Sequence, residues 1–175
     1  MLTFIRNNLL KGLKTPPRHA VGFSLIVTLA YIPIALLIGF NSGLLSVQVM
    51  DSNLIYAMPF ILIVFPSLFE EILFRGLIIP INTRDKGMKS IIFYTLLSSV
   101  IFVLWHPFNA LTINPAAQEI FLDGYFLVIA FFLGIACSLA YIMSRSLWAP
   151  VLIHWLTVVV WVCFLGGHNL MLAML

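Results

Sequence analysis

The chain has 175 residues, of which 62% are hydrophobic and only 9% are charged. Soluble domains carry about 25% charged residues, so this composition excludes an ordinary soluble protein and predicts a single bundle of membrane helices. The small net charge of +3 indicates an orientation in the membrane and some affinity for anionic lipid, and it gives no sign of nucleic-acid binding.

The apolar segments predict an all-α, polytopic membrane helix bundle. A basic segment at residues 1–19 precedes an apolar stretch that exceeds the roughly 7–15 residues of a signal-peptide core, so we expect a retained helix. About 20 helical residues cross a bilayer. On this basis residues 20–175 form one bundle of about five transmembrane helices, at residues 20–40, 53–80, 88–106, 121–143 and 147–167.

Two of these segments carry prolines that modify the prediction. The second is longer than a straight span requires, so we expect it to tilt, to protrude or to kink at Pro59 or Pro66. The third is expected to end at His106, because Pro107 disfavours helix in the residue before it.

The positive charges predict how the bundle is oriented. With a cytoplasmic N-terminus, the lysines and arginines fall on the cytoplasmic side or near the inner end of the second helix. The outer loops carry Asp51, Glu119 and Asp123 and no lysine or arginine. We therefore expect a multi-pass protein of the cell membrane with its N-terminus in the cytoplasm.

Three ionisable side chains lie inside the second apolar segment, namely Glu70, Glu71 and Arg75. A carboxylate at membrane depth costs about 3 kcal/mol on insertion scales, so each needs a partner or a use. Glu71 and Arg75 are four residues apart and are predicted to pair on one helix face. Glu70 points about 100° away from them, and we expect its partner to be His106 or His154 on a later helix.

Such a set suits hydrolysis in the membrane by either of two schemes. A glutamate that faces a histidine can act as a general base towards water, while a second histidine stabilises the developing oxyanion. Alternatively, Glu70, His106 and His154 bind a catalytic zinc ion. The sequence shows no HExxH motif and no evident second carboxylate to orient either histidine, as zinc sites usually have. We therefore prefer the scheme without a metal and expect no cofactor.

Other interpretations of these residues stay open. A buried Glu–Arg pair can be purely structural, and a histidine in an apolar helix often binds only backbone. The protein could also be a non-catalytic immunity or scaffold protein, or a small proton-coupled carrier, since intramembrane glutamates and histidines relay protons. The chain has no duplicated half, which argues against the carrier.

Three motifs resemble those of the CPBP intramembrane proteases, also called the Abi or CAAX prenyl protease family. Residues 70–75, EEILFR, fit the EExxxR motif, and residues 102–106, FVLWH, fit the FxxxH motif. His154 fits the histidine that opens a third motif. The resemblance covers about residues 50–165 and implies a core of catalytic helices that cleaves membrane peptides or lipid-modified proteins.

The resemblance also implies a role for each matching residue. Glu70 activates water together with His106, and His154 helps to hold the oxyanion. The supporting residues are Glu71, Arg75 and Phe102.

One position departs from the family pattern. The third motif usually reads HxxxN or HxxxD, whereas Val158 stands four residues after His154. Losing an oxyanion donor costs about 100-fold or more in rate. Asn109 and Thr157 are the candidate replacements.

Overall fold

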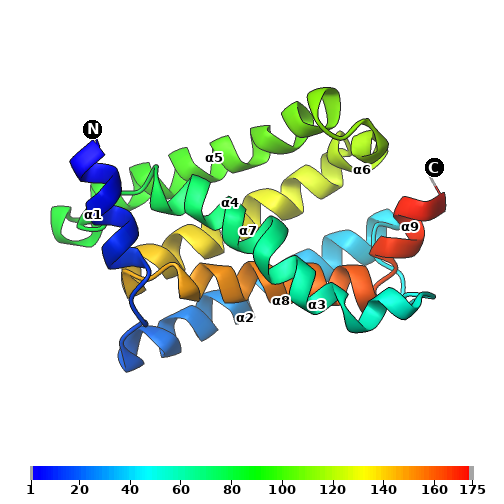
Figure 1. The fold of residues 1–175 in the computed structure, drawn as a ribbon, viewed down its shortest axis with the longest axis horizontal. Coiled ribbons are helices and arrows are strands. Elements are labelled where there is room, and N and C mark those ends of the chain that lie inside the picture. Colours follow the sequence, from blue (N-terminus) through cyan, green and yellow to red (C-terminus); the bar gives the residue numbers. More distant parts are fainter. Residues whose placement is uncertain (1, 174–175) are drawn as a thin grey trace.

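Long apolar helices run side by side along one axis of the molecule (Figure 1). The computed structural model describes residues 2–173, without the side chains of residues 2–4, 7, 19 and 171–173. Residues 174 and 175, which the predicted bundle included, lie outside the described residues. The α-helices are α1 (Leu2–Gly12), α2 (Arg18–Ser42), α3 (Met58–Leu62), α4 (Phe69–Glu71), α5 (Met88–Thr112), α6 (Gln118–Phe121), α7 (Gly124–Ser144), α8 (Trp148–Phe164) and α9 (Gly167–Ala173).

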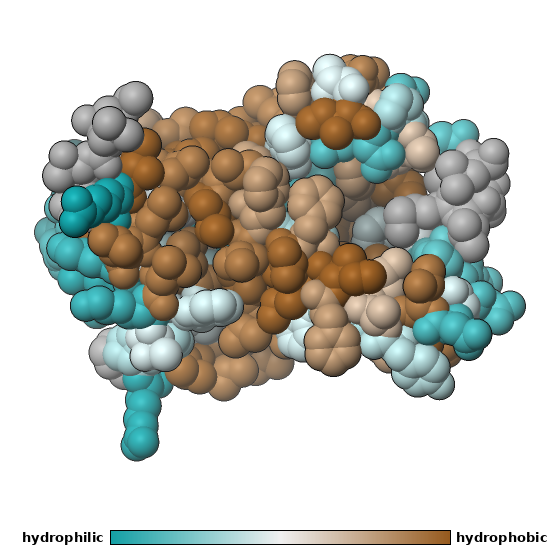
Figure 2. Space-filling view, in the orientation of Figure 1, coloured by the Kyte–Doolittle hydropathy of each residue, from teal (hydrophilic) through white to brown (hydrophobic). Residues whose placement is uncertain are grey.

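Three of these helices, α2, α5 and α7, are long and apolar enough to cross a membrane, and α8 is a shorter apolar helix of 17 residues. Hydrophobic residues cover the middle of the face shown in Figure 2, while hydrophilic residues gather towards its two ends. Apolar surface on this scale needs lipid around it, since soluble proteins rarely expose large apolar patches. The predicted fold class, an all-α membrane bundle, is confirmed.

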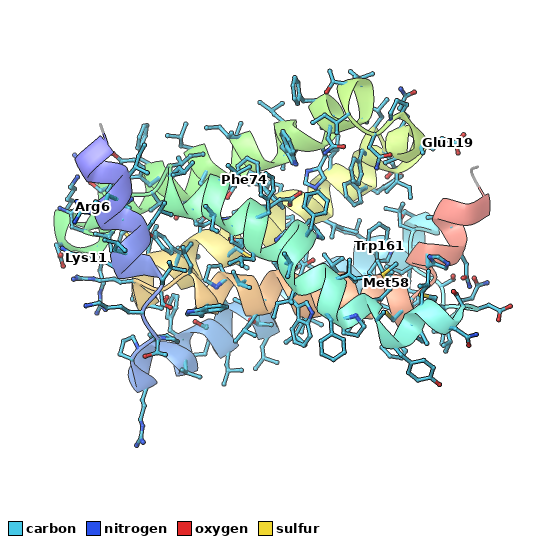
Figure 3. The ribbon with its side chains drawn as sticks, viewed as in Figure 1. Arg6, Lys11, Met58, Phe74, Glu119 and Trp161 are labelled. Carbon is cyan, nitrogen blue, oxygen red and sulfur yellow. The ribbon has the colours of Figure 1, made fainter. Side chains whose placement is uncertain are left out.

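The charged side chains lie at opposite ends of the bundle. Arg6 and Lys11 project from α1 at one end, and Glu119 lies at the other (Figure 3). Arg145 and Asp85, both largely exposed, form an ion pair. This arrangement agrees with the separation of charge in the sequence, whereas the predicted cytoplasmic position of the N-terminus remains a prediction.

Helix α7 lies at the centre and packs against α2, α5 and α8. Small residues let membrane helices approach closely, and α7 is rich in them on its buried faces. At Gly134 an added Cβ would lie 3.1 Å from the Cβ of Ser99 on α5. The largest core cluster therefore forms around α7, from Tyr31, Phe74, Phe102, Ala130, Leu133, Ala136, Cys137, Ala140, Ala149 and Ile153.

The second predicted span, residues 53–80, is a broken helix in the structure. A 3-10 turn, η1 (Asn53–Tyr56), leads into α3. The kinked segment η2 (Ile63–Leu68) precedes the short α4, and the π-helical turn η3 (Ile72–Gly76) follows it. Phe65 has extended backbone angles, φ −133° and ψ 124°, so the chain kinks directly before Pro66, as expected for one of the two prolines. The last 3-10 turn of this region, η4 (Thr83–Lys86), leads into α5.

Helix α5 does not end at His106, as its sequence predicts, but continues through Pro107 to Thr112. Membrane helices tolerate an internal proline where neighbouring elements satisfy or cover the backbone around it. Here η5 (Pro115–Ala117) and α6 fold back against α5, and they bury Ala117 and Ile120. The extra turn of α5 carries Asn109, which is also buried.

Candidate active site

Glu71 and Arg75 pair as their spacing predicts. The Arg75 Nη1 atom donates to Glu71 Oε1 at 2.8 Å, and both side chains are completely buried. Arg75 also donates from Nη2 to the backbone oxygen of Gly134 at 3.0 Å, and its guanidinium carbon lies 4.7 Å from the centre of the Phe102 ring. The arginine thus joins α4 to α7 and α5, which fixes the height of the glutamates in the bundle.

Glu71 has a second partner that the sequence did not reveal. His154 Nδ1 lies 2.9 Å from the same Oε1 atom of Glu71. A carboxylate oxygen accepts, so Nδ1 of His154 carries the proton. The Nε2 atom, on the opposite edge of the ring, faces away from Glu71. The expectation that no second carboxylate orients either histidine is therefore wrong for His154.

Glu70 faces a different set of groups. Its Oε2 atom lies 3.8 Å from Nε2 of His154, and its Oε1 accepts a hydrogen bond from Nε1 of Trp105 at 3.2 Å. Of its two predicted partners, His154 is the one in contact, and the described residues show no hydrogen bond between Glu70 and His106. Trp105 was missed as a partner, although a largely buried indole N–H usually needs an acceptor.

His106 lies across the site from the glutamates. Its Nδ1 donates to the backbone oxygen of Phe102 at 3.0 Å, which leaves Nε2 as the edge available to a ligand. The Phe102 ring contacts both histidine rings edge-on, with centroid distances of 4.9 Å to His106 and 5.7 Å to His154. Phe102 therefore separates and orients the two imidazoles while it covers Arg75.

A cavity of about 690 Å³ brings the candidate catalytic residues together. Glu70, His106 and His154 all line it, although each is at least nine-tenths buried. The rest of the lining is mostly apolar and comes mainly from α2, α3, η2, α5, α6, α7 and α8. One polar site thus lies within a largely apolar chamber.

The departure from the family pattern is visible in the same cavity. Val158 lines the cavity with an apolar side chain. Thr157 lines it too, but its hydroxyl donates to the backbone oxygen of Ile153 at 2.9 Å. Asn109 lines the cavity one turn after His106, and no hydrogen bond involves its buried Oδ1 atom. Of the two candidate replacements, Asn109 is the one whose polar group is not already bonded within its own helix.

The alternative zinc site needs three ligands at one point. Among residues 2–173 as described, no group of three or more histidine, cysteine, aspartate or glutamate side chains is placed to hold one metal ion. Both histidines use Nδ1 for a hydrogen bond, His154 with Glu71 and His106 with backbone, and this leaves their Nε2 atoms free. Because no three such side chains of the described residues converge on one point, we derive no step that uses a zinc ion.

Comparison with known proteins covers most of this site. The sequence pattern of the family described as type II CAAX prenyl endopeptidase Rce1-like matches residues 52–160, more than half of the chain. No curated protein and no solved structure matches the chain. The matched stretch includes every residue named above that touches Glu70, Glu71 or either buried histidine. The chain therefore belongs to the Rce1-like type II CAAX prenyl endopeptidases, a family of CAAX-type intramembrane proteases.

Proposed function

We propose that this protein is an intramembrane endopeptidase in which Glu70 activates the attacking water. The observation that carries the proposal is the meeting of Glu70 Oε2 and His154 Nε2, 3.8 Å apart, in the cavity that His106 also lines. At this separation one water molecule can contact both atoms, which places the water between an acceptor and the imidazole edge.

In the proposed reaction, side chains of the site move the proton and stabilise the developing charge. Glu70 takes a proton from the water, whose oxygen attacks the carbonyl carbon of the scissile peptide bond. The oxygen of that carbonyl becomes an oxyanion, which the Nδ2 amide group of Asn109 stabilises from the cavity wall, together with the Nε2 edge of His154 or His106 once that edge carries a proton. Glu70 then returns the proton to the leaving amine as the C–N bond breaks.

Glu71 and Trp105 keep the reacting groups in place. Glu71 accepts from Nδ1 of His154 and so directs the Nε2 edge towards Glu70. The Trp105 indole holds Oε1 of Glu70, which leaves Oε2 to face the water. Fixed orientation of this kind is a large part of catalysis, since misplacement by about 1 Å costs about 100-fold.

The lining of the cavity supports an apolar or lipid-modified substrate. Phe65, Phe126 and Trp161 line it together with aliphatic side chains of α2 and α3. A membrane peptide or a protein with an attached lipid would replace lipid contacts by protein contacts on entering such a chamber. Family membership agrees with a prenylated substrate, which we include in the proposal.

The direct test is Glu70→Gln in the purified protein, reconstituted in liposomes with a quenched fluorescent peptide that ends in a farnesylated CAAX sequence. We expect cleavage to fall by about 100- to 10,000-fold, the usual contribution of a general base. Glu119→Gln is the matched control, because Glu119 is exposed at the far end of the bundle. Undiminished cleavage by Glu70→Gln would contradict the proposal.

One observation favours a second candidate, a non-catalytic scaffold or immunity protein. Val158 leaves the position of the usual motif donor apolar, and it does so inside the cavity. On this alternative the wild-type protein cleaves no faster than Glu70→Gln, and the double variant Glu70→Ala/His106→Ala keeps its cellular effect while it still folds.

A further inference from the structure

The N-terminal helix α1 lies outside the stretch that matches the family, yet it contacts the catalytic segment directly. The match begins at residue 52, and α1 ends at Gly12. In Figure 1 this helix crosses one end of the bundle, beside the start of α5. The basic segment predicted at residues 1–19 is therefore, over residues 2–12, a packed helix.

A single side chain makes the closest connection. Asn8 is only 2% exposed. Its Nδ2 atom donates to the backbone oxygens of Gly76 at 3.2 Å and Ile79 at 2.8 Å, and its Oδ1 accepts from the backbone nitrogen of Ile81 at 3.0 Å. Both the NH₂ group and the oxygen of this amide thus bond to the backbone just after the EExxxR motif.

The backbone of that segment needs such a partner. The last carbonyls of a helix have no donor within the helix, and the residue four positions after Gly76 is Pro80, which has no N–H to give. Asn8 therefore acts as a helix cap supplied by a distant part of the chain. A buried carbonyl left without a partner costs about 1–3 kcal/mol, which is enough to move this end of the segment.

Packing brings α1 equally close at the same place. A Cβ added at Gly76 would lie 2.9 Å from Cδ2 of Leu9. Gly76 directly follows Arg75, whose guanidinium holds Glu71. If the backbone at Gly76 shifts, Arg75 shifts with it, and this moves the Glu71 carboxylate that contacts His154.

The other end of α1 is tied to the helix that carries His154. The backbone nitrogen of Leu147 donates to the oxygen of Gly12 at 2.7 Å, and Trp148 Nε1 donates to the oxygen of Leu13 at 2.9 Å. Leu147 caps α8, and His154 follows seven residues later, about 10 Å along the helix. Helix α1 therefore bridges the two elements whose catalytic side chains must meet.

We propose that α1, through Asn8, is a positioning element of the active site: it holds the Glu70–Arg75 segment at the height at which Glu71 and Glu70 meet His154. Asn8 itself lies outside the cavity and touches no reacting atom, so its effect on the reaction passes through Arg75 and Glu71. The expected effect on cleavage rests on the proposed function, whereas the expected effect on the position of Glu71 and His154 does not.

Two readouts test the proposal with the full-length protein. In the first, Asn8→Ala lowers kcat on the farnesylated peptide by about 10- to 100-fold. It leaves KM within about twofold, because Asn8 does not line the cavity and most of the apolar lining lies on other elements. Leu10→Ala is the matched control: it removes a larger side chain from the same helix, but one that is 57% exposed, and it keeps wild-type kcat. Equal kcat for Asn8→Ala and wild type would overturn the proposal.

The second readout does not depend on activity. In protein labelled with ¹⁵N-histidine, the ring nitrogen signals of His154, assigned with His154→Gln, report its contact with Glu71. We expect Asn8→Ala to shift them and Leu10→Ala to leave them in place; unshifted signals in Asn8→Ala would overturn the proposal even if the wild type cleaves nothing. If Asn8→Ala does not fold, Trp148→Phe takes its place, since it removes only the hydrogen bond from Trp148 to the backbone of Leu13. It should shift the same signals and lower kcat severalfold. An unchanged spectrum would overturn the positioning role of α1.

Discussion

At the scale of single residues, the site depends on one oxygen atom. Glu71 Oε1 accepts from Arg75 Nη1 at 2.8 Å and lies 2.9 Å from His154 Nδ1. The second glutamate of the EExxxR motif is therefore more than a structural partner for the arginine. It sets the direction of the imidazole that faces Glu70.

Replacing Glu71 by glutamine tests this double role. The amide keeps the shape but leaves the buried Arg75 without an opposite charge and lets His154 turn. We expect kcat to fall by at least about 100-fold, by analogy with other carboxylates that orient a catalytic histidine, and the free energy of unfolding to fall by about 3–5 kcal/mol. Peptide cleavage and thermal unfolding in detergent measure the two effects. If Glu71→Gln cleaves at the rate of Glu119→Gln, Glu71 has no part in the reaction.

A second prediction concerns the missing motif residue at Val158. Because Asn109 lines the cavity and its side-chain amide makes no hydrogen bond within the described residues, we expect its Nδ2 group to supply the donor that Val158 cannot. Asn109→Ala should lower kcat by about 100-fold or more, and Val158→Asn in the same chain should restore much of it.

Thr157→Ala is the internal comparison for that pair of variants. Its hydroxyl already donates to Ile153, so its removal should change kcat by less than about threefold, given that each tenfold change needs about 1.4 kcal/mol. Wild-type cleavage by Asn109→Ala, or no recovery from Val158→Asn, would remove Asn109 from the mechanism.

The sequence predicted the local contacts at this scale but not the distant ones. The Glu71–Arg75 pair follows from a spacing of four on a helix. The contact between Glu71 and His154 joins residues 83 positions apart, and the bond from Trp105 to Glu70 joins residues 35 apart. Such contacts depend on how helices are rotated and raised against one another, and apolar segments without a strong amphipathic pattern carry little information about that.

At the scale of elements, the apolar runs predicted where helices lie better than where they break. A kink at one of the two prolines was expected and lies at Phe65, directly before Pro66, but the π-helical turn after α4 has no signature in the residues. Helix α5 passes Pro107 because α6 and η5 cover its last turn. These outcomes are set by tertiary packing, which overrides the local preference.

The close approach of α5 and α7 gives a prediction for an element interface. Gly134 lets the two helices touch and also offers its backbone oxygen to Arg75. Gly134→Ala would bring a Cβ to 3.2 Å from the Ser99 Cα atom, so we expect the free energy of unfolding to fall by about 1–3 kcal/mol, the usual cost of overpacking. Cleavage should fall as well, because Arg75 is displaced.

Gly22→Ala is the control for this substitution. Gly22 also lies within a helix, α2, but a Cβ there would meet nothing within 4 Å. We expect a gain of about 0.5–1 kcal/mol, as for alanine in place of glycine in a helix interior. Thermal unfolding of both variants in the same detergent separates packing from helix propensity; equal shifts in the same direction would show that Gly134 marks no tight contact.

At the scale of the whole molecule, the apolar middle and the two polar ends define how the bundle sits in a membrane (Figure 2). The basic end carries α1, the Thr83–Lys86 turn and the Arg145–Asp85 pair. The opposite end carries Glu119 (Figure 3). Since lysine and arginine are retained on the cytoplasmic side, the basic end, and with it the α1 contact to the catalytic segment, should face the cytoplasm.

Labelling of single cysteines from either side of the membrane decides this orientation. Lys86→Cys replaces an exposed residue of the turn η4, and Glu119→Cys replaces an exposed residue of the short helix α6. The native Cys137 and Cys163 are buried and should not react. In intact cells a membrane-impermeant maleimide should label Glu119→Cys and spare Lys86→Cys, which should become reactive only after the membrane is opened. The reverse pattern would invert the bundle and place the α1 end outside the cell, whereas labelling of both variants in intact cells would mean that the chain between Lys86 and Glu119 does not cross the membrane.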